Sequence, residues 1–313
     1  RRGPPVTGVA GDTVGVVVMA YGTPATPADV EAYYTHIRRG RPPTAEQLAD
    51  LVARYDALGG TSSMARRTAA QVEAIATALE ARRPGAFRVA LGQKHAAPFI
   101  EDAAAELTGA GVGRFVGLVL APHFSRASVG EYQARLAEAA AGGGATAVGI
   151  ERWADDPAWI DFTARAVTDG LAGLPVASKV LFTAHSLPER VLVDDPYAEE
   201  LAASARAVAA RAGLAQWAGW GLAWQSAGRT PEPWRGPDVL QVIRDLADTG
   251  RSEGVLVCPQ GFVTDHLEVG YDLDIEARRV AEEVGLAFAR TRTVDDDPAV
   301  MGALADRVIA LAG

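Results

Sequence analysis

Residues 14–24 read Val14-Gly15-Val16-Val17-Val18-Met19-Ala20-Tyr21-Gly22-Thr23-Pro24, an apolar run followed by an aromatic residue and a turn. An unbroken apolar run of this length is typical of a strand that is buried on both faces, as in a parallel sheet. Helical periodicity follows over 27–37, 45–58 and 63–82. The stretch therefore predicts the first strand of an α/β fold in which helices cover a parallel sheet.

The alternation of strand and helix continues to the end of the chain. Strand patterns occur at 87–91, 115–120, 146–150, 180–184, 220–224, 255–258 and 286–289. Helical patterns occur at 98–107, 129–141, 157–171, 197–212, 237–249, 264–284 and 298–312. Two rounds of this alternation predict two Rossmann-like lobes, each a parallel sheet flanked by helices, with the active-site cleft between them. We expect an N-terminal lobe over 1–127 that is completed by the C-terminal segment 290–313, and a second lobe over 128–289.

The composition limits the class of protein. The chain has 313 residues, a formal net charge of −9 and 49% hydrophobic residues. An acidic globular chain is not expected to bind nucleic acid, because phosphate binding needs a basic face. We expect no membrane span and no export signal, and we expect the polar residues 1–5 to be disordered. One cysteine, Cys258, excludes an internal disulfide and fits a cytoplasmic location.

His185 is the first candidate catalytic residue. It follows an apolar strand and precedes Ser186, Pro188 and Glu189, whose spacing is typical of a helix start with a capping box. The positive end of a helix disfavours imidazolium, so we expect a neutral imidazole that accepts protons near neutral pH. A structural histidine that bonds to backbone is an equally good interpretation of these residues alone.

Three carboxylates recur every four residues near the end of the chain. Glu268, Asp272 and Glu276 are expected on one face of a helix, with Asp265 on the same side. Like charges at this spacing repel each other, and a divalent cation would relieve the repulsion. The alternative is a solvated acidic face.

Two further features are expected at the mouth of the cleft. Tyr21 follows the first strand directly, although it also suits an aromatic side chain that covers the sheet end. A basic cluster at Arg38, Arg39 and Arg41, with Arg54 downstream, stands out in an acidic chain. It is either a docking patch for an anionic small molecule or a solvated helix end. We expect structural roles for His95 and His123.

Several segments together resemble the ferrochelatase family. The similarity extends from about residue 14 to residue 312, and its motifs lie at 20–24, 34–40, 93–99, 183–188, 224–234 and 261–274. The segment 34–40 and Tyr21 resemble the branch that acts on coproporphyrin III in monoderm (high-GC) bacteria. The resemblance implies a metal chelatase of the lyase class. It would insert Fe²⁺ into coproporphyrin III to give coproheme in haem biosynthesis, with loss of two pyrrole protons.

The resemblance also implies a role for each matching residue. His185 is the expected proton acceptor, and Glu268 its partner on the metal-entry side. With these two, Asp272 and Glu276 are the expected metal-binding residues and form a hydrated conduit. Tyr21 would reach the metal from the opposite face of the ring. The residues expected to face the propionates are Arg38, Arg39, Arg54 and Ser62.

Coproporphyrin III and Fe²⁺ are the substrates that the resemblance implies. We expect no required cofactor, an optional Mg²⁺ at the outer carboxylates, and no [2Fe–2S] cluster, because Cys258 is alone. We expect a monomer that touches the next enzyme of the haem pathway transiently. The alternatives are a protoporphyrin IX ferrochelatase, a chelatase for another divalent metal, and a non-catalytic porphyrin or haem carrier. Gly270 departs from the family pattern and would loosen the metal-side helix or accommodate a bulge in it.

Overall fold

Two four-stranded parallel sheets organise the chain in a computed structural model, which describes residues 13–215, 219–228 and 230–313. The first sheet has the order β2 (Phe87–Gln93), β1 (Val14–Ala20), β3 (Arg114–Val119), β4 (Thr146–Ile150). The second has the order β6 (Trp220–Gln225), β5 (Ser178–His185), β7 (Gly254–Cys258), β8 (Ala287–Arg290). All seven residues of β1 are buried, as its apolar run predicts. The predicted α/β fold with two Rossmann-like lobes is confirmed, while residues 1–5 lie outside the described part.

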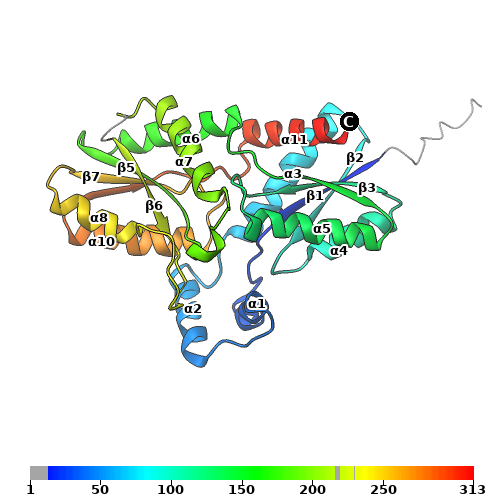
Figure 1. The fold of residues 1–313 in the computed structure, drawn as a ribbon, viewed down its shortest axis with the longest axis horizontal. Coiled ribbons are helices and arrows are strands. Elements are labelled where there is room, and N and C mark those ends of the chain that lie inside the picture. The colour runs from blue at the N-terminus through cyan, green and yellow to red at the C-terminus, as the bar shows by residue number, and fades with distance from the viewer. Residues whose placement is uncertain (1–12, 216–218, 229) are drawn as a thin grey trace, which may run out of the picture.

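Helices cover both faces of each sheet (Figure 1). On the first sheet, α3 (Met64–Arg82) and α11 (Pro298–Ala312) pack on one face, and α4 (Ile100–Gly109) and α5 (Glu131–Gly142) on the other. On the second, α6 (Pro157–Leu171) and α7 (Tyr197–Arg211) pack on one face, and α8 (Val239–Asp248) and α10 (Arg278–Glu283) on the other. Among the described residues, no helix is long and apolar enough to cross a bilayer.

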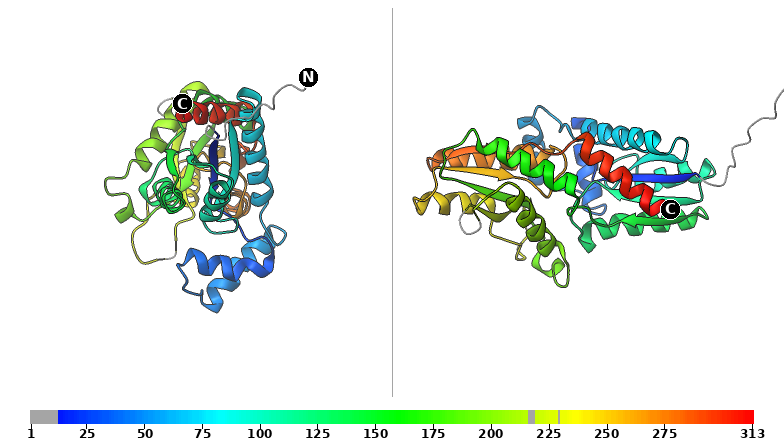
Figure 2. Two further views of the ribbon diagram at one scale, coloured as in Figure 1. Left: turned by 90° about the vertical axis from the view of Figure 1, so that its right-hand side faces the viewer. Right: turned by 90° about the horizontal axis from the view of Figure 1, so that it is seen from above.

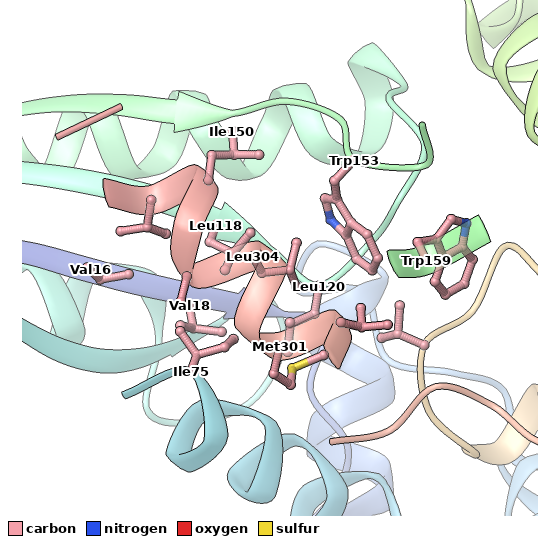
Figure 3. Packing of buried hydrophobic residues seen from close by; sticks show 14 of the residues in the cluster. Val16, Val18, Ile75, Leu118, Leu120, Ile150, Trp153, Trp159, Met301 and Leu304 are labelled. Carbon is pink, nitrogen blue, oxygen red and sulfur yellow. The ribbon is translucent and has the colours of Figure 1, made fainter. Parts of the chain in front are cut away.

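One hydrophobic core runs from the first lobe into the second. It joins strand residues such as Val16 and Leu118 to Ile75 of α3 and Leu304 of α11 (Figure 3). Trp159 of α6 belongs to the same cluster and packs edge-to-face on Trp153, with ring centroids 5.3 Å apart. The view from above in Figure 2 shows α6 and α11 as neighbours across the top of the molecule. The two lobes therefore share buried apolar surface.

The expected lobe boundary at residue 128 needs correction. Strand β4 pairs in parallel with β3, with Val148 opposite Val116. Helix α5 packs on this sheet as well, and α11 returns to it. By sheet membership the first lobe extends to Ile150, because β4 completes the sheet that β1 begins.

An arm of two helices projects from the lobes. Figure 1 shows α1 (Val30–Ile37) and α2 (Ala45–Ala57) below both sheets, and Figure 2 shows the same projection from the side. A capping box begins α2: the amide of Gln47 donates to Thr44 Oγ1 at 3.2 Å, and the amide of Thr44 donates to Gln47 Oε1 at 3.0 Å. The arm carries the arginines that the sequence marks as a basic cluster.

The helix predicted over 264–284 is not a regular α-helix. One α-helical turn, α9 (Leu267–Val269), leads into a π-helix over Gly270–Ala277 and then into α10. The π-helix begins at Gly270, where a Cβ would lie 3.1 Å from a methyl group of Leu58 at the end of α2. Of the two expectations for Gly270, the local bulge is the one found. Such wide turns are rare and occur frequently at functional sites.

Candidate active site

The candidate residues gather at the carboxyl ends of the strands. In each sheet the strand order reverses beside the central strand, at β1 in the first and at β5 in the second. Ligands of doubly wound folds bind in the crevice at such switch points. Tyr21 follows β1 and His185 ends β5, so two elements far apart in sequence present their side chains at equivalent places.

His185 and Glu268 form the central contact. His185 Nε2 lies 3.4 Å from Glu268 Oε1, and the two side chains are 33% and 40% exposed, so solvent reaches both. The other ring nitrogen, Nδ1, faces the carbonyl oxygen of Ser186. Both nitrogens therefore point at acceptors, which is the arrangement that suits a doubly protonated imidazolium.

The expected neutral imidazole at a helix start is wrong. After β5 the chain continues without a helix to a single 3-10 turn, Glu189–Val191. Ser186 does not form the predicted cap, because its hydroxyl donates to the carbonyl of Arg235 at 2.7 Å. No helix of useful length follows His185, so the charge of Glu268, rather than a helix dipole, decides whether the imidazole is protonated.

The pair holds one proton and opposite charges. Burial by itself would lower the pKa of His185, but the charge of Glu268 and the hydrogen bond to it outweigh burial and raise the pKa to about 9. Burial would likewise raise the pKa of Glu268, yet His185 lowers it to about 2. At neutral pH the resting pair is imidazolium and carboxylate.

A polar bridge holds the Glu268 backbone in place. Gln225, at the end of β6, donates from Nε2 to the carbonyl of Glu268 at 3.0 Å. Its Oε1 accepts from the hydroxyl of Thr183 in β5 at 2.8 Å. Tyr197 on α7 donates to the carbonyl of His185 at 3.4 Å. The sequence marks Gln225 only as part of the motif at 224–234, for which a structural brace is the expected role; its position at the end of a buried strand, level with His185, is the signal for this specific contact.

Asp272 lies on the π-helix with 7% of its surface exposed. Ser226, held at a φ of +61°, donates its hydroxyl to Asp272 Oδ2 at 2.5 Å. Arg54 approaches Oδ1 at 3.5 Å. Burial is the main cause that raises the pKa of Asp272 to about 7; the charges of Glu268 and Glu276 add to it, while Ser226 and Arg54 oppose it. This carboxyl is therefore close to half ionised at neutral pH.

The four expected metal-binding residues do not form a closed cage. Within the described ranges, no three His, Cys, Asp or Glu side chains lie close enough together to hold a metal ion. The structure brings His185 to Glu268, and it places Asp272 and Glu276 along the π-helix that follows. At Asp272 a hydroxyl and a guanidinium already contact the two carboxylate oxygens.

Arg54 connects the arm to this line of carboxylates. Its Nε lies 3.2 Å from Asp50, its Nη1 reaches Asp272, and its guanidinium stacks 4.8 Å from the ring centre of Tyr271. If Arg54 binds a propionate as predicted, its guanidinium would have to contact both the propionate and Asp272.

The remaining predicted residues lie on the first lobe and the arm. Tyr21 is 42% exposed, and its partial burial together with the charge of Glu268 raises its pKa above the usual value. Ser62 Oγ lies 3.0 Å from Thr23 Oγ1, which joins the arm to the loop after β1. Arg38 and the exposed Arg39 directly follow α1, and Arg38 Nε donates to the carbonyl of Arg41 at 3.2 Å.

His123 lies outside this group. It is buried and its Nε2 lies 2.7 Å from Ser204 Oγ of α7, so it links the two lobes. Burial lowers its pKa to about 3. These contacts agree with the structural role expected from the sequence.

Comparison with known proteins gives one consistent family. Residues 13–311 match the family model described as Ferrochelatase. The coproporphyrin III ferrochelatase of Geobacillus kaustophilus is 42% identical over 304 residues, which cover 95% of each chain. That of Bacillus subtilis is 41% identical over 303 residues, which cover 95% of this chain and 97% of the relative.

Solved structures of distant proteins share the fold. SirB from Bacillus subtilis with Fe³⁺ aligns with a TM-score of 0.56 at 12% identity, over 96% of each chain. CbiX, the terminal enzyme for biosynthesis of siroheme in denitrifying bacteria, aligns with a TM-score of 0.53 at 16% identity, over 95% of this chain and 98% of that one. At such identities the likeness concerns the architecture alone.

Proposed function

Since this chain belongs to the ferrochelatase family, we propose that His185, with Glu268 as its partner, gives up its own proton, accepts the two pyrrole protons of a metal-free tetrapyrrole one after the other and passes them to solvent as the metal enters. The reaction is the insertion of Fe²⁺ into coproporphyrin III, which gives coproheme in haem biosynthesis. The enzyme is a lyase, a coproporphyrin ferrochelatase. The observation that supports the proton-accepting role is the 3.4 Å contact between an imidazole and a carboxylate that solvent reaches.

Proton balance sets what this pair has to do. The free ring carries two N–H protons, and one divalent ion replaces both. The resting pair already holds one proton on His185, whose pKa is about 9. A divalent cation that approaches Glu268 screens the carboxylate and repels the imidazolium, so it lowers the pKa of His185. Arrival of the metal and formation of the free base are therefore coupled, and the exposed pair passes its protons to solvent.

The line from Glu276 through Asp272 to Glu268 is the proposed path of the metal. Its carboxylates lie on one π-helix and the turn before it. Their oxygens suit a hydrated divalent ion. Because Ser226 and Arg54 already hold Asp272, the ion would pass this residue rather than rest there.

The arm is the proposed docking site for the tetrapyrrole carboxylates. Coproporphyrin III carries four propionates, and a chain of net charge −9 binds them only where cations are concentrated. Arg38 and Arg39 directly follow α1, Arg54 lies in the last turn of α2, and Ser62 lies between α2 and α3. Tyr21 would face the ring from the side opposite to His185. A rigid cleft of this kind uses peripheral binding energy to bend the ring and expose its nitrogens.

The chain is further proposed to work without a resident cofactor. A [2Fe–2S] cluster needs several thiolates, and the single Cys258 is buried with its pKa raised to about 12. We also propose that the enzyme is a cytoplasmic monomer that passes coproheme to the next enzyme by transient contact.

Anaerobic insertion assays test the function directly. Fe²⁺ is added to the protein with coproporphyrin III or with protoporphyrin IX, and metallation is followed by absorbance. Turnover of coproporphyrin III with little turnover of protoporphyrin IX is expected. Preference for protoporphyrin IX would contradict the substrate assignment. Tight porphyrin binding with no insertion of iron, zinc or cobalt would contradict the enzymatic function and would indicate a non-catalytic porphyrin carrier.

A further inference from the structure

A chain of contacts between four rings begins at Tyr21 and continues through His95 and His36 to Phe99. The rings of Tyr21 and His95 are 4.6 Å apart between centroids and tilted by 55°. His95 meets His36 edge-on at 5.2 Å, and His36 stacks on Phe99 at 5.2 Å and 25°. These residues come from the loop after β1, the loop after β2 and helix α1, so the chain of rings joins three separate elements.

A specific polar contact fixes the two imidazoles. His36 Nδ1 lies 3.0 Å from His95 Nδ1. At this distance one nitrogen must carry the proton and the other must accept it, because two lone pairs or two N–H groups would repel. The contact selects one rotation of each ring about its side-chain bonds. His95 therefore presents a defined ring face to Tyr21.

The backbone under these rings is held as well. The amide of His95 donates to the carbonyl of Tyr21 at 3.0 Å. Gly22, at a φ of +91°, passes so close to Ala96 that a Cβ would lie 2.9 Å from the Cβ of Ala96. Tyr33 on α1 donates its hydroxyl to the carbonyl of Gly22 at 2.9 Å. With its main chain and one side of its ring supported, Tyr21 keeps its remaining 42% exposure for a ligand.

We propose that His95, seated by His36 and Phe99, is a positioning residue that sets the ring of Tyr21 against the bound tetrapyrrole. The inference rests on the proposed function, in which Tyr21 faces the tetrapyrrole. His95 acts through Tyr21 and need not touch the metal or its protons. A misplacement of about 1 Å at a reacting group can cost about a hundredfold in rate. A side chain that fixes the phenol is therefore expected to matter for turnover more than for binding.

The test is a double-mutant cycle between His95→Ala and Tyr21→Phe. If His95 acts by aiming the Tyr21 hydroxyl, His95→Ala lowers kcat about tenfold or more in the wild-type background. It then has little further effect in the Tyr21→Phe background. KM for coproporphyrin III stays within about twofold, and the thermal midpoint shows that each variant is folded.

Conservative variants show which feature of the His95 side chain positions Tyr21, its ring or its contact with His36. His95→Phe keeps a ring against Tyr21 and is expected to recover most of the lost kcat. His36→Phe keeps the stack on Phe99 and removes the Nδ1 contact, so it should give a smaller loss than His95→Ala. Equal losses from His95→Ala in both Tyr21 backgrounds, or no recovery in His95→Phe, would overturn the proposal.

A second readout keeps the inference separate from the proposed function. With ring-labelled tyrosine, the NMR signal of Tyr21 is expected to shift and broaden in His95→Ala and to remain near its wild-type position in His95→Phe. This measurement needs no turnover. If the wild-type protein is inactive but the Tyr21 signal responds to these substitutions as described, the proposed function is contradicted, while the positioning of Tyr21 by His95 is supported. An unchanged Tyr21 signal in His95→Ala would overturn the positioning role even in an active enzyme.

Discussion

His185 Nε2 lies 3.4 Å from Glu268 Oε1, although the first residue ends a strand and the second lies in a helical turn that follows a different strand. The contact makes the two groups one acid–base unit, because each shifts the pKa of the other in the direction that favours charge separation. The chemistry of the site therefore belongs to the pair.

Replacing His185 with alanine should remove the base while leaving the ring-binding surface in place. We expect His185→Ala to lower the rate of Fe²⁺ insertion by about 10²- to 10⁴-fold, which is the usual contribution of a positioned proton acceptor. Binding of metal-free coproporphyrin III, followed by fluorescence quenching, should change little. A variant that loses binding and turnover together would point to a structural role for this histidine.

Neutralising Glu268 should reverse the protonation of its partner. In Glu268→Gln the carboxylate charge is gone, and burial then acts on His185 without opposition from Glu268. The pKa of His185 is expected to fall from about 9 to near or below the ordinary value of 6.5. NMR titration of the labelled imidazole measures this directly, with the wild-type protein as the reference. An unchanged titration of His185 would show that Glu268 does not control it.

Ionisation of Asp272 is expected to lower the free energy of unfolding. Its pKa is about 7 in the folded protein against an ordinary 3.8, so ionisation disfavours the folded state. The cost is absent below about pH 4, grows between pH 4 and pH 7, and is complete above pH 7. Asp272→Asn should therefore raise the free energy of unfolding at pH 8 by on the order of 1 to 3 kcal/mol and change it little at pH 4.

Chemical denaturation at the two pH values measures the effect of Asp272→Asn. Ser226→Ala is the matched control, because it removes the hydroxyl that favours the ionised form of Asp272. It should lower stability at pH 8. A loss of stability in Asp272→Asn at pH 8 would contradict this interpretation of the buried carboxyl.

The close approach of Gly22 to Ala96 should be intolerant of a side chain. In Gly22→Ala the Cβ would lie 2.9 Å from the Cβ and 3.0 Å from the amide nitrogen of Ala96. Overpacking of this kind typically costs about 1–3 kcal/mol, in addition to the strain of a positive φ. Gly59→Ala is the matched control, because its φ is +92° and nothing lies within 4 Å of its Cβ. Equal thermal shifts in the two variants would show that the contact with Ala96 is unimportant.

Cys258 should be inert in the folded protein. It is buried at the end of β7, and burial raises the pKa of its thiol to about 12. At about pH 8 almost no thiolate is present, and a reagent cannot reach the sulfur. A thiol reagent is expected to leave the native protein unmodified and to react with one group per chain in denaturant. Rapid labelling of the native protein would contradict the buried position of this side chain.

The local sequence pattern predicts the strands and helices closely, but it predicts the geometry of the site less well. The apolar run from Val14 is long enough to predict a buried parallel strand, and the pattern over 298–312 matches the observed bounds of α11. The lobe boundary needs correction because β4 resembles any other strand of the series, and its own pattern does not show that it pairs with β3 rather than with the strands that follow it.

The electrostatics of His185 could not be derived from its neighbours in sequence. Ser186, Pro188 and Glu189 have the spacing of a helix start, but the hydroxyl of Ser186 bonds instead to the carbonyl of Arg235. The contact with Glu268 depends on where β7 and its following loop lie in the sheet. The sequence is enough to mark His185 and Glu268 as candidates. The direction in which the pKa of His185 shifts depends on the short distance between the two side chains, which the sequence does not show.

The C-terminal helix α11 has a consequence for how the chain is made. Its residues Met301 and Leu304 fill the core against β1 and β3, yet a ribosome releases them only after the whole second sheet has been synthesised. Until then, one face of the earliest-made sheet has no helix α11 to cover its apolar side chains. The first sheet is begun first but is covered by α11 last, so a chain stalled before residue 298 would expose this surface and be prone to aggregate.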